Sequence, residues 1–76
     1  MSALDDKKKA AEHVLWHYGD DRGLKPGGFV QKLLEAWNVA DGDNWHRLAE
    51  AFPAYAEALK ITEHGGLNRL AGKWNL

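Results

Sequence analysis

"NVADGDNWHRLAEAFPAYAEAL", residues 38–59, is the stretch that decides the fold. Its "ADGDN" segment predicts the end of one helix, with Asp43 or Asn44 capping the next by accepting a backbone N–H. Pro53 lacks a backbone N–H and disfavours helical geometry in the residue before it, although proline suits the first turn of a new helix. The stretch therefore predicts a helix break at Pro53.

The aromatic residues of the same stretch favour a packed core over a ligand site. They recur with apolar neighbours at three- and four-residue steps, which places them on one face of each helix. Those positions are Trp45, Leu48, Ala49 and Phe52 before the break, and Tyr55, Ala56 and Leu59 after it. Asp43 and Arg47 have the i,i+4 spacing of an ion pair in the favourable order. The aspartates are thus interpreted as caps and surface charges.

Toward the N-terminus the sequence predicts two more helices, separated by the glycine-rich connector "GDDRGLKPGG" at residues 19–28. The first runs from a cap at Ser2 to a left-handed C-cap at Gly19. The second begins at Gly27 or Gly28 and ends near Asp41. The inward positions are Leu4, Ala11, Val14, Leu15 and Tyr18 in the first helix, and Phe29, Val30, Leu33, Leu34 and Trp37 in the second.

Two interpretations of the C-terminal tail, residues 65–76, stay open. "EHGG" predicts that the fourth helix ends with Gly65 or Gly66 as its cap. Leu67, Leu70, Ala71 and Trp74 have helical spacing, so the tail is either a short docked helix or a mobile end that orders on a partner.

Length and composition predict a single all-α domain over residues 1–76, a small helical bundle of three to four helices. A chain of 76 residues without cysteine has to be stabilised by packing alone or by a partner. The net charge of −1 gives no overall attraction to nucleic acid or to anionic lipid. No apolar run approaches the length of a bilayer span or a signal peptide, so we expect a soluble, cytoplasmic protein without membrane contact. The expected core is Leu15, Leu33, Leu34, Trp37, Leu48, Phe52, Tyr55 and Leu59.

No motif for catalysis, cofactor binding or metal binding stands out. Ser2 at the terminus and Thr62 on a helix face are poor candidates for a nucleophile, and there is no cysteine. His13 and His17 are spaced i,i+4, but no local residue completes a zinc site. The connector matches no phosphate-binding motif. We therefore expect no enzyme, cofactor or metal.

Residues 18–59, "YGDDRGLKPGGFVQKLLEAWNVADGDNWHRLAEAFPAYAEAL", resemble small uncharacterised proteins of actinobacterial bacteriophages and their hosts. The shared pattern is a glycine-rich lead-in, a helix ending in "AD", then an asparagine and a later "FP". The resemblance implies a phage-type accessory or structural protein that acts by contact with another macromolecule in the host cytoplasm. It implies no activity.

The tryptophans point to a protein-interaction module. Four tryptophans in 76 residues offer more ring area than so small a core readily encloses. Trp37 belongs to the core, whereas Trp16 and Trp74 are predicted to contact a host or phage protein, or a second copy of the chain. The predicted partner-binding residues are Trp16, His13, Trp74, Leu70 and Arg69.

The alternative is a nucleic-acid-binding accessory protein. Its contacts would come from the lysine run at residues 7–9 and from the tail cations Arg69 and Lys73. Binding of this kind weakens steeply as salt rises, whereas an apolar contact hardly changes.

Overall fold

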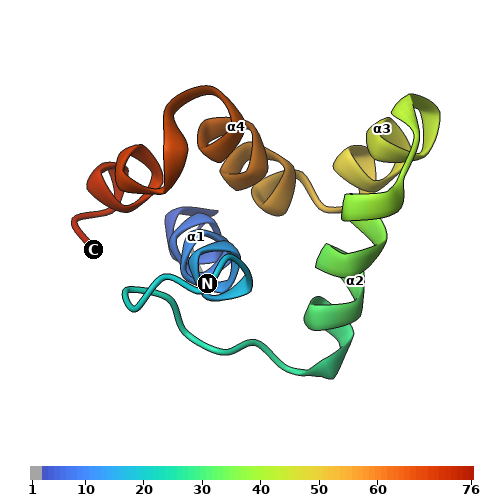
Figure 1. Ribbon diagram of the computed structural model, residues 1–76. Helices are drawn as coiled ribbons and strands as arrows, with labels where there is room; N and C mark the ends of the chain where they lie inside the picture. Colours follow the sequence, from blue (N-terminus) through green and yellow to red (C-terminus); the bar gives the residue numbers. More distant parts are fainter. Residues whose placement is uncertain (1–2) are drawn as a thin grey trace.

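The computed structural model describes residues 3–76, which fold into α-helices; a long connector, residues 18–27, joins the first two, and the later helices follow one another closely (Figure 1). The helices are α1 (Ala3–His17), α2 (Gly28–Val39), α3 (Gly42–Ala51) and α4 (Pro53–Lys73). No strand occurs within this range. The predicted all-α class is confirmed, as is the helix break at Pro53, where α4 begins. The predicted cap Ser2 lies outside the described residues.

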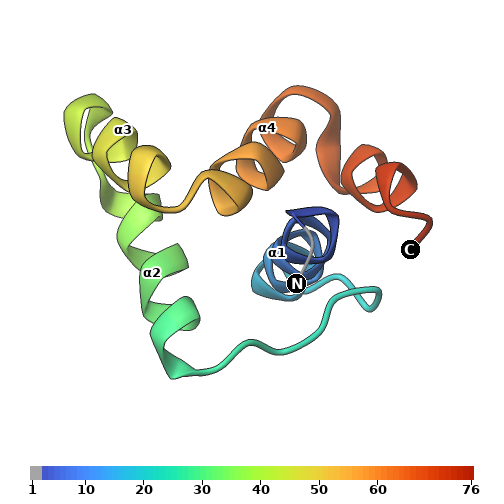
Figure 2. The same cartoon turned by 180° about the vertical axis from the view of Figure 1, so that it is seen from behind.

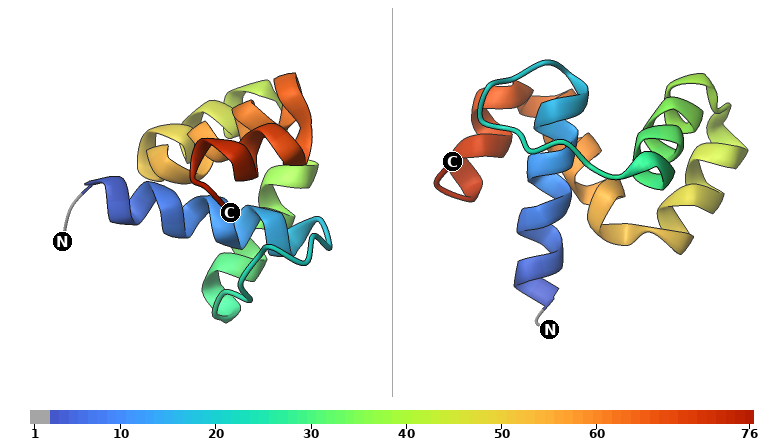
Figure 3. Two further views of the ribbon diagram at one scale, coloured as in Figure 1. Left: turned by 90° about the vertical axis from the view of Figure 1, so that its left-hand side faces the viewer. Right: turned by 90° about the horizontal axis from the view of Figure 1, so that it is seen from below.

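α1 is the central helix of the bundle. It packs mainly on α4 and also touches α2, while α3 packs on α4 and α2. After a turn near its middle, α4 doubles back, so α1 lies between the last segment of α4 and α2 (Figures 1 and 2). The same order is seen from below in Figure 3. The radius of gyration, 11.5 Å, matches the value of about 11 Å expected for a compact domain of this length.

The core forms where these helices cross. Its largest fully buried side chains are Val14 and Leu15 from α1, Leu34 from α2 and Leu70 from α4. Of the eight side chains predicted to be buried, Leu15, Leu33, Leu34 and Trp37 are buried, whereas Leu48, Phe52, Tyr55 and Leu59 are partly buried and pack against the core. Two of these four, Leu48 and Phe52, lie on α3 and the joint after it, and the other two lie on the first segment of α4.

Three side chains predicted to face inward are exposed instead. Leu4 is 65% exposed, Tyr18 48% and Phe29 68%. Each lies in the first two residues of a helix or just after its last residue. The ring of Phe29 still packs at the edge of the bundle on Phe52, with 5.8 Å between centroids.

Two helices end in the same left-handed motif. At Gly19, with φ +79°, the N–H groups of Gly19 and Asp20 donate to the carbonyls of Trp16 and Leu15, both at 2.9 Å. This confirms the predicted C-cap glycine. Asn75, with φ 59°, plays the equivalent part after α4, and the N–H of Leu76 donates to Ala71 O at 2.9 Å.

The cap of α3 corrects a prediction. Asp41, rather than Asp43 or Asn44, is the N-cap, and its carboxylate accepts the backbone N–H of Asn44 at 2.9 Å. The reason is that α3 starts already at Gly42, so Asn44 stands at the third helical position. Arg47, predicted to pair with Asp43, instead donates to Asn44 Oδ1 at 3.2 Å.

Gly66 divides α4 into two segments. Its φ of 82° and ψ of 176° lie in a region that is essentially restricted to glycine. The predicted interruption at Gly65 or Gly66 is therefore present, and residues 67–73 form the docked helix of the two alternatives, with Leu70 and Ala71 fully buried. None of the helices within residues 3–76 combines the length and apolar character needed to span a bilayer.

Candidate functional site

The predicted partner-binding residues lie on α1 and on the last segment of α4, but they do not form one exposed surface. The side chain of Leu70 is 0% exposed, so it belongs to the core and is unavailable to a partner. Trp16 and Trp74 are partly buried, and Trp74 packs against the core. Arg69 is exposed. The large exposed apolar side chains within residues 3–76 are not tryptophans but Leu4, Tyr18, Leu24, Phe29 and Val39.

His13 is engaged inside the bundle. Its Nδ1 lies 2.6 Å from the hydroxyl of Tyr55, and the two rings are stacked with 5.9 Å between centroids. Burial lowers the pKa of His13 below 6.5; nearby Lys9 lowers it further, and Glu12 opposes this. Burial also raises the pKa of the Tyr55 phenol above 10. This pair joins α1 to α4 and is therefore part of the packing.

A groove of about 610 Å³ runs along the first segment of α4. We call it the α4 groove. Pro53, Glu57, Lys60 and Ile61 follow helical spacing and contribute one continuous stripe to it. The full lining is Asp6 and Lys7 from α1, Ala49 from α3, and Pro53, Ala54, Ala56, Glu57, Lys60, Ile61 and Lys73 from α4.

The apolar part of the lining, which we call the floor of the α4 groove, comes from α3 and α4 and consists mostly of small side chains. Ala49, Ala54 and Ala56 have only a methyl group, and Pro53 begins the helix without an N–H to satisfy. Ile61 adds a larger aliphatic side chain to the lining. A partner side chain could therefore bury apolar surface against these methyl groups.

Charged side chains form the rim of the groove. Glu57 is shared by two cations, with Lys7 Nζ at 3.5 Å and Lys73 Nζ at 3.4 Å from its carboxylate oxygens. Lys60 Nζ lies 5.5 Å from the centroid of the Trp45 ring, and Lys73 Nζ lies 5.7 Å from that of Trp74. These contacts hold the lysine stems against the protein while the ammonium groups stay at the surface.

A second hollow of about 390 Å³ borders the α4 groove, because Ile61 and Lys73 line both. It adds Arg69 to the same basic rim. The two hollows together are lined by four of the ten basic residues of the chain and by two of its eleven acidic residues. The lining is thus net positive, while the whole chain has a net charge of −1.

A smaller hollow of about 260 Å³ lies among aromatic side chains at the other side of α4. Tyr18, Trp37 and Trp45 contribute rings to it, and Trp37 and Trp45 meet edge to face at 5.9 Å. The indole Nε1 of Trp37 is buried without a hydrogen-bond partner.

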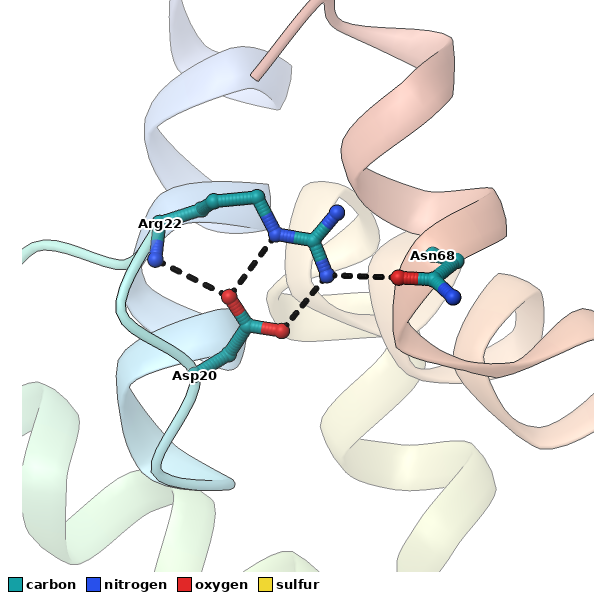
Figure 4. A network of polar contacts seen from close by, with 3 residues as sticks. All are labelled: Asp20, Arg22 and Asn68. Carbon is teal, nitrogen blue, oxygen red and sulfur yellow. Dashed lines mark hydrogen bonds and ion pairs between the residues drawn. The ribbon is translucent and has the colours of Figure 1, made fainter.

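The glycine-rich connector is tied to the end of α4 rather than open to a phosphate. Asp20 accepts hydrogen bonds from the Arg22 guanidinium at 2.9 and 2.6 Å and from its backbone N–H at 2.9 Å. Arg22 also donates to Asn68 at 2.8 Å (Figure 4). These bonds lower the pKa of Asp20 to about 2. Arg22, one of the two cations of the connector, is thus already bound to a carboxylate.

No group of three or more histidine, aspartate or glutamate side chains within residues 3–76 converges as a metal site would require. The i,i+4 pair of histidines is divided between two partners, since His13 meets Tyr55 and His17 Nε2 lies 3.0 Å from the Asn38 amide.

Sequence reasoning did not predict the α4 groove, although it named three cations of the two hollows, Lys7, Arg69 and Lys73, as contacts for a partner protein or for nucleic acid. A signal was present in the stripe at positions 53, 57, 60 and 61, which places two charged and two apolar residues on one helical face. The contribution of residues 6 and 7 could not be found in the same way, because it depends on how α1 crosses α4. Comparison with family models, with curated proteins and with solved structures finds no match to this chain.

Proposed function

We propose that this chain is a non-enzymatic protein-interaction module that binds a segment of another protein in the α4 groove. The observation that carries the proposal is a groove of about 610 Å³ whose lining combines apolar side chains with charged side chains from two helices. Sites of roughly 300–1,000 Å³ hold small ligands, and grooves between helices bind amphipathic helical segments.

The resemblance of residues 18–59 to small phage and host proteins supports the same class of function. In this proposal the chain is a phage-type accessory or structural protein in the host cytoplasm, and its partner is a host or phage protein. The contact is centred on the groove, with Arg69 and Trp74 beside it. His13 packs on Tyr55, and neither His13 nor Trp16 lines the groove, so this proposal does not place them at the contact.

Two other partners remain as alternatives. Nucleic acid is favoured by one observation, namely that Lys7 from the lysine run and Lys73 from the tail meet at Glu57. That carboxylate offsets part of their charge, which weakens the attraction to phosphate. A second copy of the chain could cover exposed apolar side chains such as Phe29 and Val39. Light scattering over a range of concentrations detects this self-association.

Peptide selection tests the groove directly. A random peptide display library is selected on the wild-type protein, and the enriched peptides are then measured on Ala54→Phe, whose ring fills the floor. The control is Ala36→Phe, which adds the same ring at an exposed position of α2 outside the groove. Far-UV circular dichroism confirms that both variants remain helical.

We expect peptides that bind the wild type and Ala36→Phe equally but bind Ala54→Phe at least about tenfold more weakly, a difference of about 1.4 kcal/mol. Failure to enrich any peptide, or equal binding to all three proteins, contradicts a binding groove at α4.

A further inference from the structure

We infer that the segment bound in the α4 groove is acidic as well as apolar, an inference that rests on the proposed function. The groove and the hollow beside it bring together Lys7, Lys60, Arg69 and Lys73, against the carboxylates of Asp6 and Glu57. A partner that inserts apolar side chains between these cations must also present groups that interact favourably with their positive charge. Carboxylates are the complementary group.

The cations at the rim have donors to spare. Each lysine ammonium carries three N–H donors, and Glu57 takes up only one interaction from Lys7 and one from Lys73. Lys60 is held by its ring contact with Trp45 rather than by a carboxylate. A partner carboxylate can therefore be bound without first displacing Glu57.

Arg69 strengthens this arrangement because its stem lies back along α4. A Cβ placed on Gly65 would come within 2.0 Å of Arg69 Cδ, so the bare backbone of this glycine makes room for the arginine. Within residues 3–76, Arg69 has no hydrogen-bond or ion-pair partner. Its five N–H donors are thus free for a carboxylate.

The distribution of charge favours a short acidic peptide over nucleic acid. Outside the groove and its neighbour the chain holds six basic and nine acidic residues, the remainder of ten and eleven, so the surrounding molecule repels a long polyanion. The floor also offers methyl groups and a proline instead of the aromatic rings on which bases stack. A peptide confined to the groove avoids the repulsion and uses the apolar floor.

Three labelled probes test the inference by fluorescence anisotropy. The first is a helix-forming peptide of about twelve residues with leucines at helical spacing and glutamates beside them. The second replaces every glutamate with glutamine, and the third is a single-stranded oligonucleotide of similar length. Each is titrated with the wild type, Lys60→Glu, Lys73→Gln, and the control Lys32→Glu, whose charge lies on α2 outside the groove.

We expect the glutamate peptide to bind at least about tenfold more tightly than the glutamine peptide and the oligonucleotide. Lys60→Glu and Lys73→Gln should each weaken the glutamate peptide severalfold, and Lys32→Glu should leave it unchanged. Circular dichroism excludes unfolding as the cause of a loss.

The inference is overturned if both peptides bind equally, if the glutamate peptide does not bind at millimolar concentration, or if the oligonucleotide binds more tightly than it. These failures are separable from failure of the proposed function. If Ala54→Phe prevents binding of the library peptides but the lysine variants leave their affinity unchanged, the groove binds protein segments without a preference for acidic residues.

Discussion

Gly23 shows how a single residue positions the connector between α1 and α2. A Cβ added there would lie 2.1 Å from the backbone nitrogen of Trp16 and 2.5 Å from its Cα. The next residue, Leu24, then donates its N–H to the carbonyl of Glu12 at 3.0 Å. Glycine is needed at position 23 because the connector lies so close to the backbone of α1 that there is no room for a Cβ atom.

Gly23→Ala should therefore lower the free energy of unfolding by about 1–3 kcal/mol, the cost of forcing an extra carbon into packed backbone. Urea denaturation followed by circular dichroism measures the loss. The matched control is Gly28→Ala, where an added Cβ meets no atom within 4 Å. Equal stability of the two variants would show that the connector does not press on α1.

His13 gives the bundle a dependence on pH. Burial is the main cause that lowers its pKa below 6.5, so the unfolded chain binds the proton more readily than the folded one. The free energy of unfolding should then decrease as pH falls below 6.5 and recover as pH rises. The reason is that the protonated imidazole is less stable in its partly buried position beside Tyr55 than in the unfolded chain. We expect the imidazole to titrate below 6.5 by NMR.

The matched stability measurement compares wild type, His13→Gln and His64→Gln between about pH 7.5 and about pH 5, above the range where most carboxylates titrate. His64 is an exposed residue, so its replacement should keep the wild-type slope. Replacement of His13 should reduce the slope of the free energy of unfolding against pH. An unchanged slope in His13→Gln would assign the pH dependence to another group.

At the scale of elements, the polar network of Asp20, Arg22 and Asn68 fastens the connector to the last segment of α4 (Figure 4). The hydrogen bonds from Arg22 are the main reason that the pKa of Asp20 falls from 3.8 to about 2. Their stabilising effect is present above pH 3.8 and is lost as pH falls toward 2, when the carboxylate is protonated.

NMR titration of the Asp20 carboxyl group should give a midpoint near 2 in the wild type and a midpoint closer to 3.8 in Arg22→Gln. Arg47→Gln is the control, since Arg47 bonds to Asn44 on α3 instead. An ordinary midpoint in the wild type would mean that the network does not persist in solution.

The sequence predicted most helix boundaries correctly, although it placed the cap of α3 two or three residues too late. Gly19, Pro53 and the glycine pair at residues 65–66 punctuate the chain by local geometry, which needs no knowledge of neighbouring helices. The exposure of Leu4 and Phe29 was missed for the opposite reason. Periodicity identifies the apolar face of a helix. Which residues of that face are buried depends on where another helix crosses it.

The candidate site belongs to the scale of the whole molecule, which explains why sequence reasoning did not find it. The α4 groove joins residues 6 and 7 to residues 49–61 and to Lys73. The spacing of residues along the sequence does not predict that these segments lie together. They do so because α1 packs on α4 and because the chain turns at Gly66, which brings the end of α4 back toward its first segment. Arg69 was selected for its charge alone, and the fold placed it beside the groove.

The same turn makes the C-terminal segment part of the core and leads to the last prediction. Leu70 is 0% exposed and is one of the largest fully buried side chains, although it belongs to a tail that could have been mobile. Leu70→Ala should cost about 2–5 kcal/mol through lost burial and a cavity. A domain of this length is stabilised by only about 4–11 kcal/mol, so the loss takes a large share of the total.

Denaturation followed in parallel by circular dichroism and by tryptophan fluorescence measures this loss for Leu70→Ala. The control is Leu24→Ala, where the same atoms are removed from a side chain that is 57% exposed. We expect the two probes to give one coincident transition that moves to much lower denaturant in Leu70→Ala and hardly moves in Leu24→Ala. Similar small losses in both variants would show that the bundle is stable without the segment after Gly66, and that Lys73 and Arg69 are not held at the groove by the core.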